Sequence, residues 1–179
     1  MKNRKIHILI ADDHALMRVG IRSMLESQSA FDVVGECCDG ESAVRMAQEI
    51  KPDVIIMDLM MPKMNGAEAT KAILESNPEI KIIVLTSFGA SVEMAKAIQA
   101  GAAGALLKES PSEELIKAIF AVMNGETAIH SEVSEYIDEL ECQPELTQRQ
   151  LEILTAIAAG NTDKAIADEF KISIAGVRK

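Results

Sequence analysis

The sequence predicts an α/β fold, a doubly wound five-stranded parallel sheet, followed by a partial all-α domain. Short apolar runs recur near residues 5–11, 32–37, 53–57, 81–85 and 103–107. Segments with helical character follow them near residues 15–27, 41–50, 65–76, 90–100 and 111–124. In the first of these segments one helical stripe is apolar, at Met17, Ile21, Met24 and Leu25. Regular alternation of strands and helices is typical of a parallel sheet with helices on both faces.

Polar residues follow four of the five apolar runs. They are Asp12 and Asp13 after the first run, Asp58 after the third, Thr86 after the fourth and Lys108 after the fifth. Taken singly, each could be a turn residue, a helix cap or a polar group facing solvent. In a parallel sheet, however, these strand ends share one edge, which is where open α/β sheets bind their ligands. We therefore expect all of these side chains to form one site.

Three carboxylates at that edge indicate a metal site. Asp12, Asp13 and Asp58 would repel one another unless a cation lay between them. Carboxylate oxygens suit a hard divalent cation, and Mg²⁺ is the expected one.

The chain around Asp58 resembles the phospho-acceptor strand of bacterial two-component receiver domains. The family pattern is Asp-x-x-Met-Pro-x-x-x-Gly, and it is matched by Asp58, Met61, Pro62 and Gly66. The resemblance implies the strand order 2-1-3-4-5. It also implies that Asp58 is a nucleophile that takes a phosphoryl group from a sensor histidine kinase or from a small donor such as acetyl phosphate.

The same resemblance implies roles for the neighbours of Asp58. Lys108 would pair with the phosphoryl oxygens, and the Thr86 hydroxyl would move to hydrogen-bond the modified Asp58. The backbone carbonyl of Met60 is implied as a further Mg²⁺ ligand. Hydrolases that use an aspartyl phosphate usually carry a second acid two residues after the nucleophile, where this chain has Met60. We therefore expect a regulatory protein rather than an enzyme.

Two positions depart from the common receiver pattern. Many receivers carry an aromatic residue three positions before the lysine of the fifth strand, where this chain has Ala105. A proline often follows that lysine, where this chain has Glu109. We therefore expect Thr86, the loop after it and backbone shifts to relay phosphorylation.

Changes in the residue pattern along the chain predict three parts. They are a receiver over residues 1–124, a linker over 125–144 and a helix-turn-helix domain over 145–179. Residues 125–145 contain seven acidic residues and no Lys or Arg, with a short helix possible at 131–140. After the linker, Thr147 and Gln150 have capping-box spacing, and Gly160 is a natural helix stop. Leu151, Leu154 and Ala158 form a stripe along that first helix. A second helix is expected over 163–170, and a third begins at Ile172.

This C-terminal segment resembles the LuxR-type DNA-binding domain, and the whole chain resembles the NarL/FixJ subfamily of response regulators. The matching residues are Leu146, Thr147, Arg149, Leu154, Gly160, Lys164, Ile166, Ala167, Ile172, Ser173 and Val177. The resemblance implies DNA as a partner, a homodimer on phosphorylation, and DNA contacts from Lys164, Ser173, Arg178 and Lys179.

Other observations weigh against DNA binding by these residues alone. Gly176 replaces the usual threonine of the recognition helix, and the sequence ends at Lys179, inside the expected domain. Residues 145–179 carry five basic and five acidic groups, so they offer little attraction for phosphates. We therefore expect weak DNA binding by this fragment, and the alternative is a phospho-acceptor and dimerisation module without DNA output.

The composition of the chain indicates the cellular compartment in which it acts. The chain has 179 residues, a net charge of −10 and three cysteines without metal-ligand spacing. An unpaired number of cysteines suits a reducing cytoplasm. No apolar run reaches the roughly 18 residues of a membrane span, and no signal-peptide pattern is present. We therefore expect a cytoplasmic protein without a membrane partner.

Overall fold

The computed structural model describes residues 4–87, 92–129, 133–134, 148–158, 160–173 and 176. The chain divides into two compact units, Met1–Asp138 and Glu139–Lys179. The expected short helix near 131–140 and the start of the third C-terminal helix lie largely outside the described residues.

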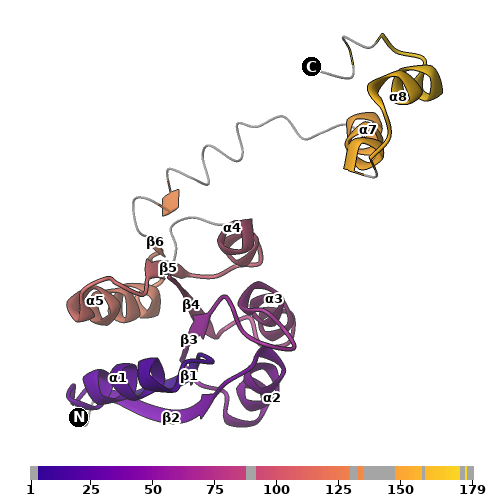
Figure 1. The fold of residues 1–179 in the computed structure, drawn as a ribbon. Coiled ribbons are helices and arrows are strands. Elements are labelled where there is room, and N and C mark those ends of the chain that lie inside the picture. The colour runs from indigo at the N-terminus through magenta and orange to yellow at the C-terminus, as the bar shows by residue number, and fades with distance from the viewer. Residues whose placement is uncertain are drawn as a thin grey trace. The chain divides into compact units, whose positions relative to one another are not determined.

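A parallel sheet forms the centre of the first unit (Figure 1). Its strands in spatial order are β2 (Phe31–Cys37), β1 (Ile6–Ala11), β3 (Val54–Asp58), β4 (Lys81–Thr86), β5 (Gly104–Leu107) and β6 (Ala128–Ile129). The order 2-1-3-4-5 is confirmed. All five residues of β3 are buried, which explains why this central strand is a continuous apolar run instead of an alternating one.

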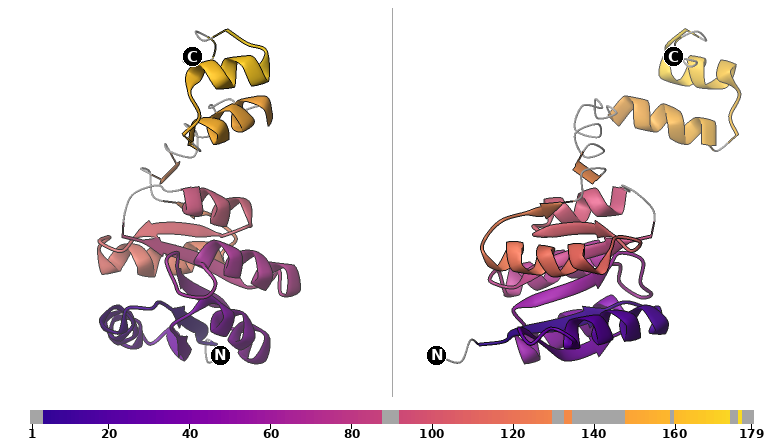
Figure 2. Two further views of the ribbon diagram at one scale, coloured as in Figure 1. Left: turned by 45° about the vertical axis from the view of Figure 1, so that its right-hand side comes forward. Right: turned by 90° about the vertical axis from the view of Figure 1, so that its left-hand side faces the viewer.

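Helices cover both faces of the sheet (Figure 2). One face carries α1 (Ala15–Glu26) and α5 (Ser112–Met123), and the other carries α2 (Gly40–Ile50), α3 (Gly66–Ser76) and α4 (Val92–Gln99). Alternate residues of one strand therefore enter different cores. Leu9 packs in the core under α2, α3 and α4, whereas Ile8 and Ile10 pack in the core under α1 and α5.

The sixth strand was not expected from the sequence. Residues Ala128–Ile129 lie in the predicted acidic linker, yet they pair in parallel with Gly104 and Ala105 of β5. Val133 is fully buried in the core under α2, α3 and α4. A strand of two residues is too short to show a period, so the pattern of the sequence could not reveal it.

The described residues of the second unit form two helices that lie side by side, α7 (Gln148–Ala158) and α8 (Asp163–Phe170). The bounds of α8 are those expected, and the Thr162 side chain caps it by accepting a hydrogen bond from the Ala165 N–H. Gly160 has a φ of 81°, which suits its predicted place after the end of α7.

Two members of the stripe predicted on α7 are exposed, and the side chain of the third, Leu151, lies outside the described residues. Leu154 is 47% exposed and Ala158 is also exposed. Ile153 and Ala156, three residues apart, instead pack against Ile166 and Ala167 of α8. Both stripes are apolar at helical spacing, and contact with α8 decides which one is buried.

Candidate functional site

The carboxyl ends of the strands place the expected residues at one edge of the sheet. Asp12 directly follows β1, Asp58 ends β3, Thr86 ends β4 and Lys108 directly follows β5. The register aligns these ends, because Asp58 lies opposite Leu85, the residue before Thr86. The Lys108 N–H donates to the Thr86 carbonyl over 2.7 Å, which ties the last two strand ends together.

Lys108 joins two of the acids. Its Nζ lies 2.8 Å from Asp12 Oδ2 and 2.8 Å from Asp58 Oδ2. All three side chains are buried, with the Lys108 side chain 6% exposed. Burial lowers the pKa of Lys108, but its hydrogen bonds to Asp12 and Asp58 outweigh that effect and raise it. The lysine therefore stays protonated and supplies a fixed positive charge at the site.

Asp58 is held at both of its carboxylate oxygens. Oδ2 contacts Lys108, and Oδ1 accepts a hydrogen bond of 3.2 Å from the Met60 N–H. Burial raises the pKa of Asp58, and the nearby charge of Asp12 raises it further, while Lys108 and the Met60 N–H oppose the shift. The ionised form of Asp58 is therefore destabilised by its surroundings. Additional positive charge nearby would stabilise it.

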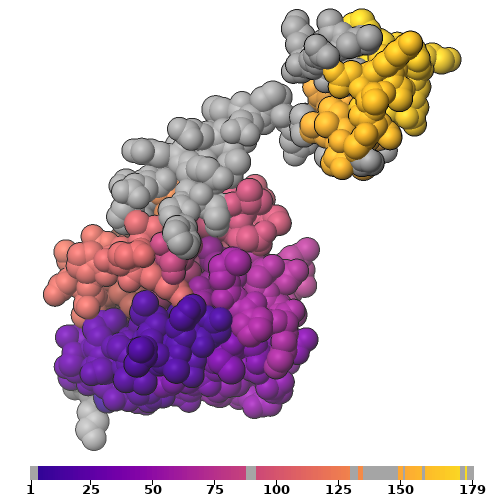
Figure 3. All heavy atoms as spheres, viewed as in Figure 1, coloured from indigo at the N-terminus to yellow at the C-terminus, as the bar shows by residue number. Residues whose placement is uncertain are grey.

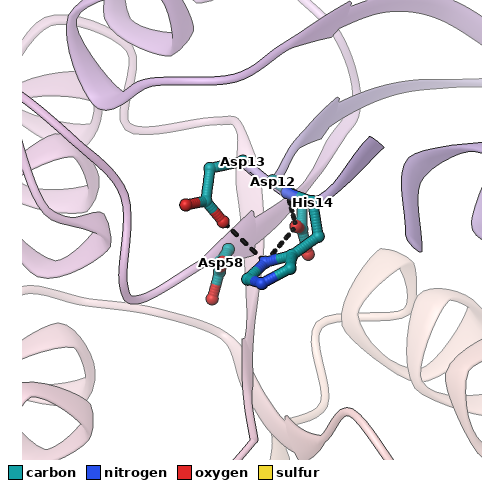
Figure 4. A group of neighbouring side chains, drawn as sticks. All are labelled: Asp12, Asp13, His14 and Asp58. Atoms are coloured by element: carbon teal, nitrogen blue, oxygen red, sulfur yellow. Dashed lines mark hydrogen bonds and ion pairs between the residues drawn. The ribbon is translucent and has the colours of Figure 1, made fainter. Parts of the chain in front are cut away.

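A group of four side chains at this edge could hold a metal ion (Figure 4). Asp12, Asp13, His14 and Asp58 each offer one ligand atom, and these atoms lie within 4.8 Å of one another. Asp12 and Asp58 are buried, whereas Asp13 and His14 are exposed. Three carboxylates fit a hard divalent cation, so the residues present suit the metal that the sequence suggested. His14 belongs to this group and was missed, although it directly follows Asp13.

Thr86 and Ala105 occupy the two positions that the receiver resemblance connects with switching. Thr86 is buried at the end of β4, one strand away from Asp58. Ala105 is fully buried within β5 and packs in the core. The position where many receivers carry a rotating aromatic side chain therefore holds a small core residue.

The predicted DNA contacts are only partly described. Lys164 is exposed on α8. Ser173 is exposed, and its Oγ accepts a hydrogen bond of 3.1 Å from the Gly176 N–H, as expected at the start of a helical turn. Arg178 and Lys179 lie outside the described residues.

A parallel sheet of this order, with paired acids and a buried lysine at its carboxyl edge, defines a receiver domain. The response regulator receiver domain family matches residues 8–120. The family of bacterial regulatory proteins of the luxR type matches residues 144–178. The chain belongs to the two-component response regulators with a LuxR-type DNA-binding domain.

Two curated relatives extend over nearly the whole chain. The transcriptional regulatory protein LiaR of Bacillus subtilis is 42% identical over 181 residues, covering 97% of this chain and 86% of the relative. The response regulator protein VraR of Staphylococcus aureus is 38% identical over 178 residues, covering 97% and 85%. These relatives favour a transcriptional response regulator over a module without DNA output.

Solved structures of a response regulator are also similar to this chain. A structure of the Salmonella typhimurium response regulator RcsB matches with a TM-score of 0.86 at 28% identity, covering 97% of this chain and 88% of that one. An RcsB–DNA complex matches with a TM-score of 0.81 at 28% identity, covering 98% and 87%. Within the part of the chain described here, no helix combines the length and hydropathy needed to cross a membrane.

Proposed function

We propose that Asp58 accepts a phosphoryl group from a sensor histidine kinase and thereby controls transcription through the C-terminal domain. The observation that carries this proposal is the shared contact of Lys108 with Asp12 and Asp58 at the carboxyl edge of the sheet. It joins the expected nucleophile, a metal-binding acid and a cation in one buried cluster.

The transfer needs only these groups. A carboxylate oxygen of Asp58 attacks the phosphorus of a phosphohistidine or of acetyl phosphate, and the bond from phosphorus to the donor nitrogen or oxygen breaks. Acetyl phosphate releases acetate, and a phosphohistidine with a proton on its other ring nitrogen releases neutral imidazole, so both transfers balance without a further reactant. No general base is required, because the ionised carboxylate carries no proton to remove. Lys108 stabilises the negative charge on the transferring oxygens.

Mg²⁺ is the cation we propose for Asp12, Asp13, Asp58 and the backbone carbonyl of Met60. When bound, it would supply positive charge that offsets the repulsion between the acids and the incoming phosphoryl group. After transfer, the Thr86 hydroxyl donates to the phosphoryl group, and Lys108 pairs with it. These two contacts bias the receiver toward its active form.

The C-terminal domain converts phosphorylation of the receiver into control of transcription. We propose a receiver over residues 1–124, a linker over 125–144 whose first part pairs with the receiver sheet as β6, and a DNA-binding domain over 145–179. The proposed DNA contacts are Lys164, Ser173, Arg178 and Lys179. Two copies pair on phosphorylation, and the solved structure of two RcsB dimers bound to two parallel DNAs supports this pairing. The protein acts in the cytoplasm as a regulator, and its phosphoryl chemistry serves signalling instead of turnover.

Replacement of the proposed nucleophile tests the function. The protein is incubated with acetyl phosphate and Mg²⁺, and phosphoryl adducts are counted by intact-mass spectrometry. We expect one adduct on the wild type and none on Asp58→Asn. The matched control is Asp53→Asn, because Asp53 directly precedes the same strand and pairs with Arg4 at its opposite end. An adduct that persists in Asp58→Asn, or is lost only in Asp53→Asn, contradicts the assignment.

A further inference from the structure

His14 contributes an imidazole to a site that otherwise offers only oxygen ligands. Its Nδ1 lies 2.7 Å from Asp13 Oδ1 and 3.5 Å from Asp12 Oδ1. Figure 4 shows the ring among the three carboxylates and beside Asp58. The four ligand atoms lie within 4.8 Å of one another, a span that a single ion can bridge with only small side-chain shifts.

A backbone hydrogen bond fixes the position of His14 beside Asp12. The His14 N–H donates to Asp12 Oδ1 over 2.7 Å, so the chain turns tightly between the two residues. His14 is the N-cap residue of α1, yet its side chain makes no capping hydrogen bond. The ring is therefore not used to begin the helix and faces the acidic group.

The side chain also has room to take part in binding. It is 70% exposed, whereas the side chains of Asp12 and Asp58 are only 2% and 3% exposed. The buried acids form the floor of the site, and Asp13 with His14 form its open side. A hydrated ion entering from solvent meets the open side first.

We propose that His14 is an additional metal ligand, which makes the site favour first-row transition ions that bind imidazole, such as Co²⁺, more strongly than its three carboxylates would. Imidazole nitrogen suits these ions, while Mg²⁺ keeps oxygen ligands and water. The inference rests on the proposed function, since it extends the same metal site. It concerns which ion is held and leaves the role of Asp58 unchanged.

The test compares two metals on matched variants. Isothermal titration calorimetry measures the affinity for Co²⁺ and for Mg²⁺ at pH 7.5 in a background with Cys38 and Cys142 replaced by Ser, since thiolates also bind Co²⁺. The variants are His14→Gln and His14→Leu. The control is His7→Gln, because His7 lies near the amino end of β1, away from the acids.

We expect both His14 variants to lose at least about tenfold in Co²⁺ affinity, which is the loss typically seen when a group that supports a metal site is removed. The change in Mg²⁺ affinity should be much smaller. His7→Gln should match the background protein for both ions. Equal losses for the two ions, or no loss of Co²⁺ affinity, overturn the role of His14. If the background protein binds neither ion, the proposed metal site itself fails, and this inference fails with it.

Discussion

Lys63 Nζ lies 2.9 Å from Asp39 Oδ2, so an ion pair connects the loop after β3 with the start of α2. Asp39 also caps α2 by accepting a hydrogen bond from the Ser42 N–H. Lys63 has a φ of 67°, a left-handed conformation that costs a residue with a Cβ some free energy. The ion pair and the conformation together hold the loop that runs from Asp58 to α3.

Breaking this ion pair should destabilise the receiver at neutral pH. The hydrogen bond from Lys63 and that from the Ser42 N–H lower the pKa of Asp39 to about 2, from its usual 3.8. A lowered carboxyl pKa stabilises the folded state fully above the usual value and loses that effect as the pH falls toward the lowered one. The difference in stability between wild type and Asp39→Asn should therefore be largest at pH 7 and shrink from about pH 4 toward about pH 2. Urea denaturation at several pH values measures it.

Asp39→Asn removes the negative charge and keeps the helix cap, because an Asn side chain can still cap α2. A second pair of variants isolates the backbone. Lys63→Met and Lys63→Gly both remove the ion pair, but only glycine adopts the positive φ without strain. Lys63→Gly should be the more stable of the two in the same denaturation experiment. If Lys63→Met is equally stable, the left-handed conformation carries no measurable cost.

Gly66 packs directly on the backbone of Asp58. A Cβ at Gly66 would lie 2.2 Å from the Asp58 carbonyl oxygen, so Gly66→Ala should cost about 1–3 kcal/mol or more of stability. Gly20→Ala is the control, since a Cβ there meets nothing within 4 Å and alanine is the better helix former. Thermal denaturation of both variants measures the effect. Gly66→Ala with a melting temperature equal to that of Gly20→Ala would show that the strand end yields easily.

The sequence predicted most of the receiver because local patterns agree with the fold there. Buried strands read as apolar runs, and Asp58, Thr86 and Lys108 each mark a strand end. The rest depends on contacts between distant residues. The pair of Lys63 with Asp39 joins residues 24 positions apart, and nothing in their local sequence indicates it. The buried face of α7 is a second example, since contact with α8 selects it and the local pattern does not.

The face of α1 is expected to pair two receivers on phosphorylation. Leu16 and Val19 are 87% and 63% exposed, a large amount for apolar side chains on one helix. Figure 3 shows α1 and α5 as neighbours on the surface of the first unit. A cavity of about 430 Å³ beside Leu16 reaches the β5 end and is lined by Met17, Gly20, Leu107 and Lys108 among others. We expect beryllofluoride with Mg²⁺ to convert the wild type from monomer to dimer in light scattering.

Charged replacements on that face test the pairing. Leu16→Glu with Val19→Lys should stay monomeric with beryllofluoride, because apolar contact is lost. Val92→Glu is the control, since Val92 is also exposed, at 52%, but lies on α4. Loss of dimers in the control alone would place the interface on the α4 face instead. A wild type that remains monomeric under all these conditions contradicts pairing of this chain by either face.

Met60 is expected to prolong the life of the phosphorylated form. Hydrolysis needs a water in line with the bond between Asp58 and phosphorus, and the Met60 side chain, two residues after Asp58 and 69% exposed, cannot usefully hydrogen-bond such a water. Met60→Asn supplies an amide that can orient the water, so decay of the phosphorylated protein should quicken. Met60→Leu keeps an apolar side chain and should decay like the wild type. Phe88, two residues after Thr86, lies outside the described residues, and Phe88→Glu forms the second arm of the test. Decay that is unchanged in both polar variants would mean that neither side chain shields the acyl phosphate.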